Sequence, residues 1–150
     1  MNKLIKKYLS SFQWKKRGDD DIVILKDNAP KELQDSVMEA HGNRMPNDWI
    51  YEKYYGILDA LDGYTIENID DVDNYEYEII DGLIDVYTSN ITAWLNDSDY
   101  NVYYLTEALE NEEPKDGFKA LQLAQYKAIQ EIFSFVRTML ENRKEDGKNE

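Results

Sequence analysis

The sequence of 150 residues contains no cysteine and a single histidine, His41. Without cysteine the chain has no disulfide and no thiolate nucleophile, so nothing in it indicates an oxidising compartment. A zinc site would need carboxylates for nearly all of its ligands, which is uncommon. Glycine is also scarce, and its seven residues are scattered, so the sequence has no glycine-rich phosphate loop. These absences exclude several common catalytic and cofactor sites.

Long apolar runs are also missing. No stretch has the length and composition of a signal peptide or of a membrane span, so we expect a cytoplasmic protein. The mean hydropathy of −0.72 is low, and by itself it would suggest disorder. Apolar residues nevertheless make up 42% of the chain and aromatic residues 13%, which is typical of a folded core. We therefore predict one folded domain over residues 1–150.

Basic residues are almost absent from the middle of the chain. Residues 45–113, here called the acidic body, hold eighteen acidic residues and one base, Lys53. The chain as a whole has a net charge of −14, yet residues 1–17 hold six bases and no acid. Helix surfaces usually pair Glu with Lys at i,i+4, whereas the pairs Asp48/Glu52 and Asp81/Asp85 are like-charged at that spacing. Such self-repulsion indicates a surface that recognises a charged partner, or one that only maintains solubility.

The hydrophobic periodicity predicts an all-α fold, a compact bundle of about five to six helices. Helices are expected over residues 3–16, 30–41, 48–61, 74–95 and 118–141. A further helix is expected to begin at Ser98, with an apolar stripe of Val102, Leu105 and Leu109. Residues 22–25 are too short for a helix and could be a lone strand or an extended segment. Residues 65–73 are predicted to be an acidic connector, and residues 142–150 a frayed tail.

The N-terminal segment, residues 1–17, is basic and amphipathic. Its basic side could dock on the acidic body or contact anionic lipid, or its apolar side could pack as part of the core. The stripe Leu4, Ile5, Tyr8, Leu9 and Phe12 favours packing, because a short basic helix binds only membranes that contain anionic lipid.

The helix expected over residues 74–95 has the clearest two-sided pattern. Ile80, Ile84 and Tyr87 share one face at 100° per residue, and Glu78, Asp81 and Asp85 lie opposite. The acidic body also holds ten of the twelve tyrosines, each of which more often bridges core and water than binds a partner. The partner-binding residues are predicted to be exposed carboxylates: Asp48, Glu52, Asp59, Asp62, Glu78, Asp81, Asp85, Glu107 and Glu110.

Neither a metal site nor a catalytic site is expected. Residues 97–101 begin like an EF-hand calcium loop, but Val102 occupies the glycine position and Ala108 the position of the bidentate glutamate. Carboxylate pairs could support acid–base catalysis, yet thirty-one acidic residues will produce close pairs by chance. We therefore expect no cofactor, no metal and no enzyme activity.

The segment ELQDSVMEAHGNRMPNDWIYEKYYGILDAL, residues 32–61, and the helix EIIDGLIDVYTSNITAWLND, residues 78–97, resemble the small acidic antirestriction proteins of phages, the Ocr-like family. The pattern is a short helix that begins E-L-x-D, a polar break that ends in proline, an aromatic-rich helix, an acidic connector and a further helix. The resemblance covers roughly residues 32–110. It implies a helical DNA mimic that occupies the DNA-binding channel of restriction and related defence enzymes through surface carboxylates, without catalytic residues.

The first functional hypothesis is accordingly a phage-encoded DNA-mimic inhibitor of a DNA-binding host-defence enzyme, of restriction or CRISPR type. Its expected partner is a DNA-binding protein or nuclease complex in the host cytoplasm. We expect no direct nucleic-acid binding and no stable membrane association, and a homodimer is left open. The alternative is a non-catalytic phage accessory or assembly protein whose acidity serves solubility or protein–protein binding.

Overall fold

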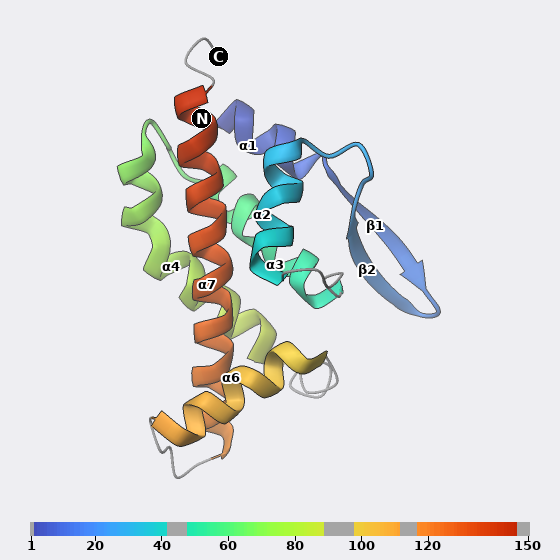
Figure 1. The fold of residues 1–150 in the computed structure, drawn as a ribbon, viewed down its shortest axis with the longest axis vertical. Coiled ribbons are helices and arrows are strands. Elements are labelled where there is room, and N and C mark those ends of the chain that lie inside the picture. The colour runs from blue at the N-terminus through green and yellow to red at the C-terminus, as the bar shows by residue number, and fades with distance from the viewer. Residues whose placement is uncertain (1, 42–47, 89–97, 112–116, 147–150) are drawn as a thin grey trace.

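The computed structural model describes residues 2–41, 48–88, 98–111 and 117–146. Within these ranges the chain forms six helices and one β-hairpin: α1 (Asn2–Leu9), β1 (Phe12–Arg17), β2 (Asp20–Leu25), α2 (Lys31–His41), α3 (Asp48–Asp62), α4 (Ile69–Thr88), α6 (Ser98–Asn111) and α7 (Gly117–Asp146). Helix α7 contacts α2, α3, α4 and α6, and in Figure 1 the hairpin projects on the opposite side from α4. The fold is mostly helical, as predicted, but it is not all-α.

The N-terminal helix is shorter than the predicted range of 3–16, because it ends at Leu9. The hydroxyl groups of Ser10 and Ser11 donate to the backbone carbonyl of Lys7 at 2.7 and 3.2 Å. Carbonyls of the last helical turn have no partner within the helix, so these two side chains stabilise its end. The helix therefore ends before the last bases of the segment, which follow it in the chain.

The rest of that segment forms a two-stranded antiparallel hairpin. Gly18 has a φ of 63°, the positive value that a two-residue hairpin turn requires. Lys16 and Asp21 are partners in the register and form an ion pair at 2.7 Å. In β1 only Phe12 is buried, and the other five residues of the strand are exposed. Residues 22–25, predicted to be extended or a lone strand, belong to a paired strand.

Helices α2 and α3 confirm the ranges predicted for them to within one residue. Pro30 comes directly before α2, where its missing N–H costs no helical hydrogen bond. Its carbonyl oxygen accepts from the backbone N–H groups of Leu33 and Gln34 at 3.0 and 3.1 Å. Gly63 follows α3, as expected of a residue that ends a helix.

Helix α4 starts at Ile69, so the predicted acidic connector over 65–73 is partly helical. Asn68 caps the helix, because its side-chain oxygen accepts from the backbone N–H groups of Asp70 and Asp71 at 2.9 and 3.3 Å. The Asp71 carboxylate reaches back to the N–H groups of Glu67 and Asn68 at 2.8 and 3.2 Å. This reciprocal arrangement is a capping box in which Asp71 is the acidic member. Residues 89–95 of the predicted helix lie outside the described residues.

The buried face of α6 differs from the predicted stripe. Tyr104 and Ala108 are buried, Leu105 is half-buried, and Leu109 is exposed. The side chain of Val102 lies outside the described residues. The stripe is thus rotated by about one residue, which a helix with few apolar side chains does not specify strongly.

Helix α7 continues to Asp146, beyond the predicted end at residue 141, so the predicted frayed tail begins as helix. The Arg143 side chain pairs with Glu32 of α2, with Nε and Oε2 at 3.2 Å. The Tyr8 hydroxyl of α1 donates to the same Oε2 atom at 3.1 Å. These contacts join the last turns of α7 to two elements from the start of the chain. Residues 147–150 lie outside the described residues.

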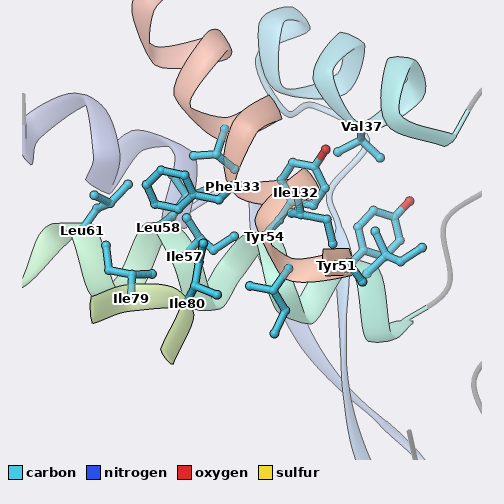
Figure 2. Close-up of a cluster of buried hydrophobic side chains, with 14 of the residues drawn as sticks. Val37, Tyr51, Tyr54, Ile57, Leu58, Leu61, Ile79, Ile80, Ile132 and Phe133 are labelled. Atoms are coloured by element: carbon cyan, nitrogen blue, oxygen red, sulfur yellow. The ribbon is translucent and has the colours of Figure 1, made fainter. Parts of the chain in front are cut away.

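Helix α3 lies at the centre of the core. Figure 2 shows its buried side chains between those of α4, α7 and α2. The residues that meet there are Tyr54, Ile57, Leu58 and Leu61 of α3, Ile79 and Ile80 of α4, Ile132 and Phe133 of α7, and Val37 of α2. The buried residues of the other elements, Ile5, Phe12 and Val23 among them, join the same cluster. One continuous core therefore holds α4 in place and fixes which of its faces is outward.

Arg137 joins α7 to α4 by an ion pair. Its Nε and one terminal nitrogen donate to the two carboxylate oxygens of Asp73 on α4 at 2.5 and 3.0 Å. These hydrogen bonds, with a further one to Glu141, raise the pKa of the guanidinium. Such two-point pairing of a guanidinium with a carboxylate is directional.

Replacement of Arg137 by methionine should lower the free energy of unfolding. We expect a loss of about 1 kcal/mol, because the pair is partly exposed and water screens it. Thermal unfolding followed by circular dichroism measures this as a fall in Tm of about 2–4 °C. The matched control is Lys31→Met, which removes the exposed Lys31–Asp35 pair and should leave Tm unchanged. An equal loss in both variants would contradict a specific role for Arg137.

Candidate functional site: the acidic helix faces

The outward face of α4 carries a row of polar side chains. Val72, Ile79, Ile80 and Ile84 are buried on the inner side of the helix. On the outer side, positions three or four apart are all exposed: Asp70, Asn74, Tyr77, Glu78, Asp81 and Asp85. Residues at this spacing share one helix face. We call the four acids of this face, Asp70, Glu78, Asp81 and Asp85, the α4 acidic row.

One carboxylate of the row is held by a neighbouring tyrosine. The Tyr64 hydroxyl donates to Oε2 of Glu78 at 2.8 Å, and this hydrogen bond is the main reason why the pKa of Tyr64 is raised. The Tyr64 ring stacks on Tyr75, with centroids 4.1 Å apart. Within the described ranges, neither Asp81 nor Asp85 takes part in an ion pair. Their charges therefore remain available at the surface.

The predicted site residues of α3 lie on a different face. Asp59 is exposed, whereas Glu52 and Asp62 are half-buried rather than exposed as predicted. These three share a helix face with Tyr55, whose ring meets the edges of Phe12 and Trp14 at centroid distances of 5.9 and 5.6 Å. This face of α3 is thus on the side of the hairpin and not on the side of the α4 acidic row. The side chain of Asp48 lies outside the described residues.

The two predicted residues of α6 differ from each other. Glu110 is exposed. Glu107 is half-buried, and its carboxylate pairs with Lys127 of α7 at 3.6 Å. Of the nine predicted carboxylates, the structure brings together Glu78, Asp81 and Asp85 on one exposed face, and it places the α3 group separately.

Lys53, the one base in the acidic body, is fully buried, with 0% of its surface exposed. Its side chain is therefore not part of the surface that the acidic body presents to solvent. Ile50 and Ile57, three residues before and four after it, are buried apolar residues of the same helix. That spacing was the signal in the sequence that could have placed Lys53 on the inner side of α3.

Tyr77 is the second residue of note that the predicted site did not include. A tyrosine in an acidic helix usually bridges core and water, yet 68% of the Tyr77 surface is exposed. Its distance from Asp81, four positions, placed it on the acidic side rather than the apolar side of the helix.

The described residues contain no group of three or more His, Asp or Glu side chains that could hold a metal ion. None of the helices in the described ranges is long and apolar enough to cross a membrane. The apolar side of α1 is used within the molecule, because Ile5 and Tyr8 are fully buried. Packing is thus the role that the structure gives this side of the N-terminal helix.

Comparisons of the chain with models of protein families, with curated proteins and with solved structures find no match.

Proposed function

We propose that the chain is a DNA-mimic inhibitor, which binds and blocks a DNA-binding enzyme of host defence, of the restriction or CRISPR type. The observation that supports this most is the α4 acidic row, an exposed helix face with four acids on a helix that has no base. The burial of Lys53 adds to it, since the acidic body then presents no described base to solvent. A site that holds DNA is positively charged and attracts such a surface.

The size of the row limits how closely it can copy DNA. Asp70 and Asp85 are fifteen residues apart, which is about 22 Å along a helix at about 1.5 Å per residue. Duplex DNA carries one charge per ~1.7 Å of its axis, so about 22 Å of duplex carries roughly thirteen charges. The row supplies four. The row thus resembles DNA in the sign of its charge and in the direction of its electrostatic field. The rest of the acidic body contributes further negative charge from its other faces.

The same negative charge argues against nucleic acid as a direct partner. An acidic surface repels phosphate, so the proposed inhibitor does not bind nucleic acid itself. It would act in the host cytoplasm without a cofactor and without stable membrane association. Inhibition by occupation of a binding site requires no catalytic group in this chain.

Capture and release by DNA tests the proposal. The protein is immobilised and exposed to a bacterial lysate, and one portion is eluted with duplex DNA and another with NaCl. We expect the retained proteins to be DNA-binding enzymes that duplex DNA releases, because both ligands compete for one channel. Inhibition of their DNA binding should weaken steeply between about 50 and about 200 mM salt. Inhibition that changes neither with salt concentration nor with competitor DNA would exclude mimicry.

One observation favours a second function. The predicted carboxylates lie on separate helix faces, as expected if acidity only keeps an accessory or assembly protein soluble. In that case NaCl and duplex DNA would release different proteins, and duplex DNA would release none that binds DNA.

A further inference from the structure

Tyr77 has the largest exposed fraction, 68%, among the large apolar side chains exposed in the described ranges. One exposed aromatic residue is ordinary in itself. The position of this one is informative, since the ring stands in the middle of the α4 acidic row. Asn74 precedes it by three residues and Asp81 follows it by four, so both side chains are its neighbours on the helix surface.

Two other tyrosines close to the row, Tyr64 and Tyr75, are engaged differently. Tyr64 and Tyr75 are stacked on each other, so one face of each ring is covered. The Tyr64 hydroxyl is also used, by Glu78. Tyr77 has no ring partner of this kind among the described residues, and the helix that carries it has no base.

An aromatic ring beside a carboxylate matches the chemistry of an arginine side chain. The guanidinium stacks on the face of a ring, and its fork of N–H donors reaches a carboxylate at the same time. Lysine is a strongly hydrated point charge and gains less from such a pair. Neighbouring side chains at i,i+4 are about 5–6 Å apart, within the span of one guanidinium that contacts both.

We propose that Tyr77 and Asp81 together receive an arginine side chain of the partner protein, so that the α4 acidic row selects arginine over lysine. This inference rests on the proposed function, in which the partner presents the bases of a DNA-binding site. It goes further by assigning recognition to an aromatic face as well as to charge. The Tyr77 contribution should therefore persist at salt concentrations that weaken the carboxylates.

Peptides test this without knowledge of the partner. Binding of oligoarginine and oligolysine peptides of equal length is measured by isothermal titration calorimetry at about 0.15 M salt, where surface charges beyond about 8 Å are screened. We expect the protein to bind oligoarginine about two- to fivefold more tightly than oligolysine. Tyr77→Phe should keep this preference, and Tyr77→Leu should lose it, because leucine is apolar but has no π face.

The matched control is Val86→Ala, which changes another exposed apolar residue of α4 that lies off the row. This variant should bind both peptides as the parent protein does. An arginine preference that survives in Tyr77→Leu overturns the inference, and so does one that is lost in Tyr77→Phe or is absent from the parent protein. None of these outcomes alters the DNA competition experiment, so failure of this inference is distinguishable from failure of the proposed function.

Discussion

Deletion of residues 1–17 should abolish cooperative folding. The deletion removes α1 and β1, and with them Ile5, Tyr8 and Phe12, all of which are buried. Burial of such side chains contributes about 1.5–3 kcal/mol each, so the three together contribute about 5 kcal/mol or more. A domain is stable by only about 5–15 kcal/mol in total. We expect the truncated protein to show no sharp thermal transition by circular dichroism.

Two further variants separate packing from charge. Tyr8→Ala removes a fully buried ring and its hydrogen bond to Glu32, and should lower the free energy of unfolding by about 3–5 kcal/mol. Replacement of the exposed Lys3, Lys6 and Lys7 by glutamine should leave Tm unchanged. The lipid-binding alternative predicts the reverse, namely an unchanged Tm for the deletion and a loss of binding to anionic liposomes.

The variant Glu78→Lys, Asp81→Lys, Asp85→Lys should bind the target of the proposed inhibition at least about a hundredfold more weakly. Each reversal replaces an attraction by a repulsion, and a surface charge pair contributes about 1 kcal/mol. The fold should be retained, because all three side chains are exposed on the face opposite the core. Affinity is measured by competition with labelled duplex DNA for the target, and folding is checked by Tm.

The control for this variant carries the same number of reversals elsewhere. Asp19, Asp27 and Glu39 are exposed and lie outside the acidic body, so their replacement by lysine gives the same net charge. We expect this control to bind the target nearly as well as the parent protein. If both variants are weakened equally, net charge matters and the location of the carboxylates does not, which would leave the solubility alternative.

The sequence predicted α2, α3 and the two sides of α4 because local signals determine them. Proline and glycine residues bracket α2 and α3, and the 3.6-residue period of α4 separates Ile80 and Ile84 from Asp81 and Asp85. The hairpin was missed because β1 has a single buried residue, Phe12, and because its strand pairing depends on residues that follow it in the chain. A period alone carries no information about such pairing.

One further difference is local, and the others arise from tertiary contacts. The start of α4 depends on the capping by Asn68 and Asp71, which in the sequence looked like part of an acidic connector. The C-terminal extension of α7 coincides with the Arg143–Glu32 pair, which joins residues far apart in the chain. Within the candidate site, the exposure of Asp81 and Asp85 followed from periodicity. The half-burial of Glu52 and Asp62 depends on what α3 packs against, which no local pattern specifies.

The position of α7 also determines when the fold can be completed during synthesis. This last helix contacts α2, α3, α4 and α6, and the Ser36 hydroxyl of α2 donates to the Phe135 carbonyl oxygen across 99 residues of sequence. A ribosome releases the chain from its N-terminus, so the apolar faces of the earlier helices stay uncovered until α7 has been synthesised. Over that interval the charge of the acidic body disfavours association between unfinished chains.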